Sequence, residues 1–115
     1  MSATAINTDV PASGDGCVEC LETDGWWVML RRCAACGHVG CCDSSPGQHA
    51  TGHYEATGHK VMQSFEPGED WMWDFEKEKG VPFVQLAPPT SRPEDQPSPG
   101  PEGKVPANWR ELIHR

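Results

Sequence analysis

The sequence predicts a small α+β domain, in which a twisted antiparallel sheet packs on one main helix between disordered tails. Several short apolar segments, separated by turn residues, have the length of strands. One segment near the middle carries the start and stop signals of a helix. Proline and glycine, with 11 and 12 residues in a chain of 115, gather towards the two ends. The ordered part of the chain is therefore expected to be short and central.

The main helix is expected to begin at Ser45, with Pro46 in the first turn and Gln48 closing a capping box. It should run to about Thr57, because Gly58 can adopt the left-handed conformation that ends a helix. Strands are expected at Trp26–Leu30, Lys60–Phe65, Trp71–Phe75 and Val81–Leu86.

The chain divides into four parts by composition. Residues 1–14 are small and polar and are expected to form a disordered leader, and residues 15–86 form the domain. Residues 87–106 are a proline-rich linker, which should be extended because its sequence cannot form a packed core. Residues 107–115 could form a short helix, although nine residues are marginal without docking.

The apolar content indicates that the domain needs a cross-link. Only 37% of the residues are hydrophobic, and a compact part of roughly 70 residues usually needs a metal or disulfides. Residues 1–14 have no basic start followed by an apolar run, and no segment approaches the ~18 apolar residues of a membrane span. We therefore expect a monomeric cytoplasmic protein that does not enter a membrane. In the reducing cytoplasm, clustered cysteines favour metal binding over disulfides.

The net charge excludes one class of partner. The chain carries a formal charge of −8, whereas proteins that bind nucleic acid present a basic face to the phosphates. A protein or peptide is the expected partner.

Cysteines and histidines occur at spacings that suit zinc. Two Cys-x-x-Cys pairs, each able to direct two thiolates to one tetrahedral ion, are followed by an adjacent cysteine pair and three spaced histidines. His49 and His53, four residues apart, share a helical face. Four or five cysteines and three histidines can thus complete two tetrahedral sites. The candidates are Cys17, Cys20, Cys33, Cys36, Cys41, Cys42, His49, His53 and His59.

Two positions are ambiguous from the residues alone. Cys41 and Cys42 cannot both face one site in an extended segment, because successive side chains point in opposite directions. One of them is a ligand, and the other is a small buried hydrophobe. His38 is expected to lie near a site or at the surface without binding metal.

The order of these residues resembles the UBP-type zinc finger, in particular its stand-alone bacterial form. The resemblance rests on the two Cys-x-x-Cys pairs, on CGHVGCCDSSPGQHATGH and on EPGEDWMW, between about Cys17 and Glu76. It implies two Zn²⁺ ions, and the family spacing Cys42-x6-His49 selects Cys42 over Cys41. The implied first site is Cys17, Cys20, Cys42 and His49, and the implied second site is Cys33, Cys36, His53 and His59.

The resemblance also implies a peptide pocket. Family members that bind ubiquitin hold its C-terminal Gly-Gly between aromatic side chains, whose positions match Trp27, Trp71 and Trp73 here. The family's Cys-Gly-Arg reads Cys42-Asp43-Ser44, so the arginine that contacts the carboxylate is absent. This departure argues against ubiquitin binding in the familiar manner, unless Arg31 or Arg32, both expected in solvent, replaces that arginine.

These features predict a zinc-folded interaction module rather than an enzyme. Closed zinc sites leave no open coordination position, and no nucleophile is paired with a base. We expect a binder of a peptide or C-terminal tail with structural zinc. The alternative function is a thiol redox switch, in which oxidation of the cysteines releases zinc.

Overall fold

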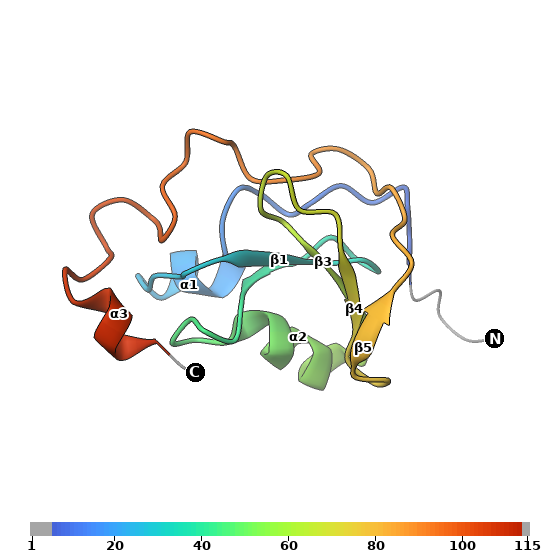
Figure 1. The fold of residues 1–115 in the computed structure, drawn as a ribbon, viewed down its shortest axis with the longest axis horizontal. Helices are drawn as coiled ribbons and strands as arrows, with labels where there is room; N and C mark the ends of the chain where they lie inside the picture. The colour runs from blue at the N-terminus through green and yellow to red at the C-terminus, as the bar shows by residue number, and fades with distance from the viewer. Residues whose placement is uncertain (1–5, 114–115) are drawn as a thin grey trace.

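A computed structural model of the chain describes residues 6–113 and shows a five-stranded sheet with one main helix (Figure 1). The sheet has the order β2-β1-β3-β4-β5, and every neighbouring pair is antiparallel. The α+β prediction is confirmed. The strands are β1 Leu30–Cys33, β2 Val39–Cys41, β3 Val61–Ser64, β4 Met72–Asp74 and β5 Lys79–Val81. The helices are α1 Val18–Glu22, α2 His49–Thr57 and α3 Trp109–Leu112.

Helix α2 packs on one face of the sheet, and the proline-rich tract and the described N-terminal segment run along the other side (Figure 1). Its close approach requires glycine at position 40 of β2, where a Cβ atom would lie 2.7 Å from the backbone nitrogen of Ala50. Ala50 is the buried residue of α2. The helix therefore has little apolar surface with which to hold itself on the sheet.

The apolar core is divided into two clusters. The first combines three cysteines with larger side chains and consists of Cys17, Cys20, Trp27, Leu30, Val39, Cys41 and Phe65. The second lies under β3 and β4 and consists of Ala34, Val61, Met72 and Leu86. Because cysteines form nearly half of the first cluster, its packing depends on what those thiols bind.

The predicted helix starts too early. The structure begins α2 at His49, after Gln48 in a left-handed conformation (φ 48°) without a side-chain cap. The hydroxyl of Ser45, expected to cap the helix, instead accepts a hydrogen bond from the backbone nitrogen of Val28 at 2.8 Å. The predicted end is correct, because Gly58 has φ 78° and donates its N–H to Tyr54.

The first predicted strand is displaced. The ladder begins at Leu30, which pairs with Cys41, while Trp27 forms an isolated bridge with Gly100 through N···O distances of 2.7 and 3.0 Å. Trp27 and Val28 therefore bond to the C-terminal tract, whereas the carbonyl of Met29 accepts the backbone nitrogen of Cys42, just after β2. β3 and β4 lie within the predicted segments, and β5 overlaps its prediction only at Val81. The sequence reading missed α1 and β2, which are five and three residues long.

The described part of the predicted leader lies against the domain. The backbone nitrogen of Asn7 donates to the carbonyl of Ala34 at 2.7 Å, and Ser13 exchanges hydrogen bonds with Gly37 and Val39. A Cβ atom at Gly37, which has φ +80°, would lie only 2.1 Å from the carbonyl oxygen of Pro11. Residues 6–14 thus differ from the disordered leader that was predicted, whereas residues 1–5 lie outside the described residues.

The proline-rich tract follows the opposite face of the sheet from α2 (Figure 1). Arg92 bonds through its backbone to Phe65, and its side chain forms an ion pair with Glu66 at 2.9 Å. The second carboxylate oxygen of Glu66 accepts the backbone nitrogen of Leu30 at 2.8 Å. The tract runs mostly through bends and turns, and these contacts join it to β1 and to the residues that follow β3. Beyond it, α3 covers four residues of the segment 107–115, and residues 114–115 lie outside the described part.

Arg32 was expected in solvent, but only 1% of its surface is exposed. Its guanidinium donates to the carbonyl oxygens of Pro89 and Val10, both at 2.7 Å, and so ties the C-terminal tract and the N-terminal segment to β1. Its Nε and the Oε1 of the cross-strand Gln63 are buried without hydrogen-bond partners. These two groups are a matching donor and acceptor on neighbouring strands.

The Arg92–Glu66 pair should contribute more to stability than the exposed Lys104–Asp24 pair, which also joins the C-terminal tract to the domain. Arg92→Ala leaves a buried carboxylate without its cation, which should lower the free energy of unfolding by roughly 3–5 kcal/mol. Lys104→Ala, which breaks the exposed pair, should cost less than about 1 kcal/mol. Urea unfolding of the zinc-loaded variants measures both values. Equal losses would show that the tract is not anchored at Glu66.

Candidate metal centres

The first Cys-x-x-Cys pair is positioned by α1. Cys17 is the N-cap of this helix, and its sulfur accepts the backbone nitrogen of Cys20 at 3.4 Å. A thiolate at a helix N-terminus is favoured by the N–H groups that point towards it. The short helix thereby turns both sulfurs of the pair to the same side.

The second pair lies in the turn between β1 and β2. Cys33 ends β1, and the chain reverses through Cys36 and Gly37, whose backbone nitrogen donates to the carbonyl of Cys33. The sulfur of Cys33 accepts the backbone nitrogen of Ala35 at 3.4 Å. The turn therefore holds two thiols where β1 ends and β2 begins, close to His53 of α2 and to His59.

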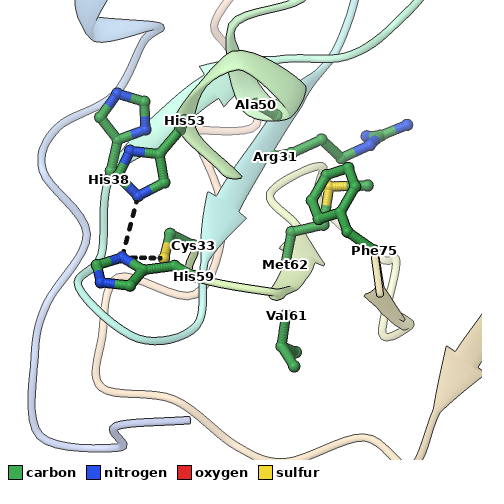
Figure 2. A pocket seen from close by; sticks show the side chains of 9 residues that line it. All are labelled: Arg31, Cys33, His38, Ala50, His53, His59, Val61, Met62 and Phe75. Atoms are coloured by element: carbon green, nitrogen blue, oxygen red, sulfur yellow. Dashed lines mark hydrogen bonds between the residues drawn. The ribbon is translucent and has the colours of Figure 1, made fainter. Parts of the chain in front are cut away.

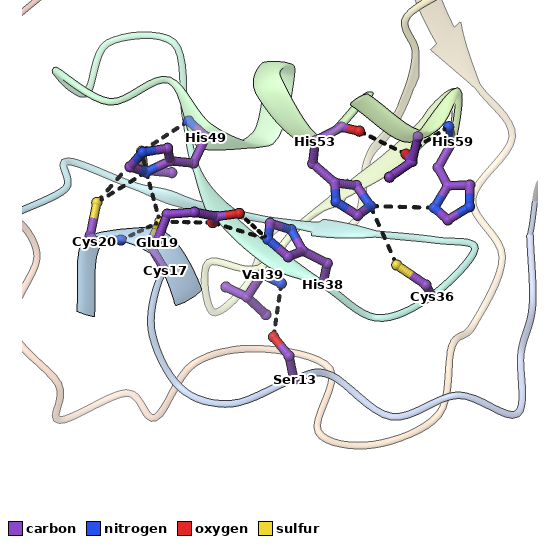
Figure 3. A network of polar contacts seen from close by, with 12 residues as sticks. Ser13, Cys17, Glu19, Cys20, Cys36, His38, Val39, His49, His53 and His59 are labelled. Atoms are coloured by element: carbon purple, nitrogen blue, oxygen red, sulfur yellow. Dashed lines mark hydrogen bonds and ion pairs between the residues drawn. The ribbon is translucent and has the colours of Figure 1, made fainter. Parts of the chain in front are cut away.

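Helix α2 supplies histidines to two separate groups of cysteines, as Figure 3 shows. His49 is its first residue and points to α1, whereas His53, one turn later, points to the β1–β2 turn. His59 follows the end of the helix and comes back towards His53 (Figure 3). His49 and His53 share a helical face, as their i, i+4 spacing indicates, but they belong to two different sites.

The first cluster brings four donor atoms together. The Nδ1 atom of His49 lies 3.2 Å from the sulfur of Cys17 and 3.4 Å from each sulfur of Cys20 and Cys41. The sulfurs of Cys20 and Cys41 are 3.9 Å apart. All four donors lie within 4.8 Å of one another.

The second cluster consists of Cys33, Cys36, His53 and His59, as predicted. Figure 2 shows His53, His59 and Cys33 directed towards one another. His59 Nδ1 is 3.5 Å from the sulfur of Cys33 and 3.3 Å from His53 Nε2, which is 3.3 Å from the sulfur of Cys36. Again the four donors lie within 4.8 Å.

These distances fit tetrahedral zinc. Zn–S and Zn–N bonds of about 2.3 and 2.05 Å place neighbouring ligand atoms about 3.8 Å apart for S···S, 3.6 Å for S···N and 3.35 Å for N···N. The observed separations are 3.9 Å for S···S, 3.2–3.5 Å for S···N and 3.3 Å for N···N, and they follow the same order. The donors are thiols and imidazoles, which zinc prefers, and each set has four members. The two clusters therefore fit two Zn²⁺ ions in closed structural sites.

The acid–base properties of the thiols also favour a bound cation. Hydrogen bonds from the thiols of Cys17 and Cys20 lower the pKa of Cys41 to about 2, whereas the neighbouring thiols raise the pKa of Cys20. Burial raises the pKa of Cys33 to about 11 and, together with nearby His38 and His59, lowers the pKa of His53 to about 4. Without a metal, the first cluster thus stabilises only one of its three cysteines as a thiolate. A divalent cation is needed to stabilise all three thiolates side by side.

Cys41, not Cys42, belongs to the first cluster, and this corrects the predicted ligand. Cys41 ends β2, and its sulfur also accepts the backbone nitrogen of His49 at 3.2 Å. The next residue points the other way, as alternation in an extended chain requires, so the sulfur of Cys42 contacts Ser45 at 3.5 Å instead. The alternation argument identified the ambiguity, but the family spacing resolved it in the wrong direction.

His38 connects the two clusters without belonging to either. Its Nε2 lies 2.8 Å from a carboxylate oxygen of Glu19, which is on α1 between the first two cysteines. Its ring stacks on that of His53, with centroids 4.1 Å apart (Figure 3). The carboxylate of Glu19, the imidazole of His38 and the imidazole of His53 thus form a continuous chain of contacts from the first cluster to the second. His38 thus lies near a site without belonging to a ligand set, as expected, although the sequence did not indicate its contacts with Glu19 and His53.

Only two of the three predicted pocket tryptophans share a cavity. Trp71 and Trp73 line a cavity of about 370 Å³, together with Val28, Met29, Arg31, Cys42, Asp43, Ser44 and Met62. Trp27 is 2% exposed, belongs to the first core cluster and faces a different cavity beside the C-terminal tract. Trp27 is therefore not part of the cavity lined by Trp71 and Trp73, because its ring fills the core next to Cys17 and Cys20.

Comparison with known proteins agrees with this geometry. A family model described as "Zn-finger in ubiquitin-hydrolases and other protein" matches residues 17–86. The chain belongs to this family of zinc fingers, and its domain is a zinc-binding module rather than a catalytic domain.

Protein RPA1320 from Rhodopseudomonas palustris, solved in solution by NMR, is similar in sequence and in fold. The two chains are 42% identical, with a TM-score of 0.65, over 76% of this chain and 87% of the other. A search of curated proteins found no match. Within residues 6–113 no helix is long and apolar enough to cross a membrane.

The metal content tests the two-site assignment. We expect two Zn²⁺ per chain, and chelation should unfold the domain, because α2 buries only one residue and structural zinc in small fingers carries about 10–16 kcal/mol of apparent binding energy. Elemental analysis and near-ultraviolet circular dichroism of the tryptophans measure these properties. One zinc per chain, or an unchanged tryptophan signal after chelation, would refute the assignment.

The adjacent cysteines give a sharper test of the ligand set. Cys41→Ser should lose about one equivalent of zinc and destabilise the domain, because it removes a ligand from the first cluster. Cys42→Ser should keep both ions, since its sulfur contacts only a hydroxyl. Zinc loss from Cys42→Ser and not from Cys41→Ser would show that Cys42 is the ligand, as the family spacing indicated.

Proposed function

We propose that the chain is a zinc-dependent interaction module that binds the C-terminal tail of a partner protein in the cavity lined by Trp71 and Trp73. The observation that carries this proposal is the place of Arg31. Its guanidinium carbon lies 4.7 Å from the ring centre of Trp71, at the wall of the same cavity. A cation is therefore available where the expected arginine after Cys42 is missing.

The surroundings of Arg31 support a role in binding an anion. Its Nη1 donates to the carbonyl of Leu30 at 3.0 Å, and its Nη2 lies 3.9 Å from the sulfur of Met29. No carboxylate forms an ion pair with it among residues 6–113. The remaining N–H groups of the planar fork are suited to a terminal carboxylate.

Asp43 limits what the cavity accepts. One of its carboxylate oxygens accepts the hydroxyl of Thr51 on α2, which fixes the side chain at the cavity wall. Two like charges about 4 Å apart repel by about 4 kcal/mol at an effective dielectric near 20. A tail that carries its carboxylate to Arg31 therefore has to keep it away from Asp43, so the ligand should differ in position from a Gly-Gly tail held beside Cys42.

The cavity also favours a narrow, apolar chain end. Trp71 is 38% exposed, and Met29 and Met62 add flexible apolar surface to the same cavity. Aromatic faces and methionines suit small or apolar residues next to a terminal carboxylate. The charge of −8 disfavours nucleic acid as a partner, and we propose a protein partner for a monomeric, non-enzymatic module in the cytoplasm.

Replacement of Arg31 tests this function. Arg31→Gln should weaken the binding of peptides that end in a free carboxylate by about 1.5–3 kcal/mol, the usual value for a hydrogen bond to a charged group. The same peptides with an amidated C-terminus should bind the unmodified protein about as weakly. Titration followed by tryptophan fluorescence measures both effects.

Two further variants complete this test. Lys77→Gln removes a positive charge from the exposed turn between β4 and β5 and should leave affinity unchanged. Asp43→Asn should strengthen binding, because it removes the negative charge from the cavity wall. Equal affinity for the free and amidated peptides would show that Arg31 does not bind a terminal carboxylate.

A further inference from the structure

The two metal centres differ in how far a dissolved molecule can reach their sulfurs. In the first cluster, Cys17, Cys20 and Cys41 are 0%, 2% and 0% exposed. In the second, Cys33 is 5% exposed, but Cys36 lies open at the surface. Every other cysteine of the chain is buried. Cys36 is therefore the thiol that a small solute meets first.

The cysteine sulfurs also differ in whether a backbone N–H group donates a hydrogen bond to them. Backbone N–H groups of Cys20, Ala35 and His49 point to the sulfurs of Cys17, Cys33 and Cys41, respectively. Such bonds withdraw electron density from a thiolate and make it a weaker nucleophile. The Cys36 sulfur instead lies 3.3 Å from Nε2 of His53, which belongs to the same ligand set. The Cys20 sulfur likewise has no backbone N–H donor but is 2% exposed, so among the described residues Cys36 is the ligand sulfur that is both exposed and without such a donor.

We propose that the second cluster is a site of reversible thiol oxidation, in which a hydroperoxide joins Cys33 and Cys36 by a disulfide and one Zn²⁺ is released. The first cluster keeps its ion. This inference concerns the zinc ligands alone and does not depend on what the cavity beside Trp71 binds.

The reaction balances with hydrogen peroxide as the two-electron oxidant. The Cys36 thiolate attacks one peroxide oxygen, so that an S–O bond forms, the O–O bond breaks and the departing hydroxide takes a proton to become water. The Cys33 thiolate then attacks the oxidised sulfur, so that the S–S bond forms and the second oxygen leaves as hydroxide and is protonated to water. Two thiolates lose two electrons, one peroxide gains them, and two protons are taken from solvent.

The position of the pair allows the second step. The two sulfurs belong to one Cys-x-x-Cys turn and lie within 4.8 Å of each other, so closing to the ~2.05 Å of a disulfide needs only a local movement. The disulfide removes two of the four ligands, and the two remaining histidines cannot complete a tetrahedral site. Zinc is therefore released from this cluster.

The first cluster should withstand the same treatment. Its three sulfurs are buried in the core beside Trp27 and Phe65, and its histidine is at the opposite end of α2 from the second site. Loss of the second zinc frees His53 and His59, so the C-terminal part of α2 should loosen while its first turn stays attached. The expected product is a chain with one zinc and one disulfide.

The test uses the full chain loaded with two zinc ions and treated with hydrogen peroxide. A metallochromic indicator follows zinc release, and alkylation followed by peptide mass spectrometry locates the disulfide. We expect one equivalent of zinc in a first phase, a Cys33–Cys36 disulfide, and recovery of the two-zinc form after a thiol reductant and zinc are added. Release of both ions in one phase, a first disulfide among Cys17, Cys20 and Cys41, or no release at millimolar peroxide would overturn the proposal.

Two variants identify the reacting thiol. Cys36→His keeps four ligands in the second cluster but removes the exposed sulfur, and it should slow the first phase at least tenfold. Cys42→Ala, which removes a thiol outside both clusters, should react as the unmodified chain does. An unchanged rate in Cys36→His would contradict the proposal. If this variant binds fewer than two zinc ions, disulfide mapping of the unmodified chain decides between the outcomes.

Discussion

The two histidines of α2 have to reach two different groups of cysteines, and the rest of the domain is arranged around this requirement. The helix has nine residues, a glycine near its middle and one buried side chain, so neither propensity nor apolar packing would hold it. Metal at His49 fixes its first turn against α1, and metal at His53 and His59 fixes its end against the β1–β2 turn. Zinc thus replaces the apolar face that an ordinary helix of this size would use.

The opposite face of the sheet is covered in another way. There the N-terminal segment and the proline-rich tract take the place of a second layer, and they are attached through the buried charges of Arg32, Glu66 and Arg92. A tract with many prolines has few N–H groups to offer, so side-chain donors from the sheet bind its carbonyls. The cavity proposed to bind a partner lies beside Trp71 and Cys42, whereas the exposed thiol of the second metal cluster is that of Cys36.

Much of the candidate site could be predicted from the sequence because ligand spacing is a local property. Seven of the eight ligands follow from two Cys-x-x-Cys pairs and three histidines. β3 and β4 follow from short apolar segments separated by turn residues, and the end of α2 follows from Gly58. The strand expected at Trp26–Leu30 failed because its backbone partner, Gly100, lies more than 70 positions away. The helix start failed because the hydroxyl of Ser45 has a distant competitor, the backbone nitrogen of Val28.

The sequence by itself determined that this chain is a zinc-held α+β module, since thiols and imidazoles at these spacings have one dominant use in a chain with so little apolar content. Only the tertiary structure decided between Cys41 and Cys42, because two adjacent side chains differ in the face to which they point and not in chemistry. It likewise placed Trp27 in the core, Arg32 inside the protein and Arg31 beside Trp71. The direction of a side chain depends on strand register and on the packing of distant segments, and neither is a property of a residue and its neighbours.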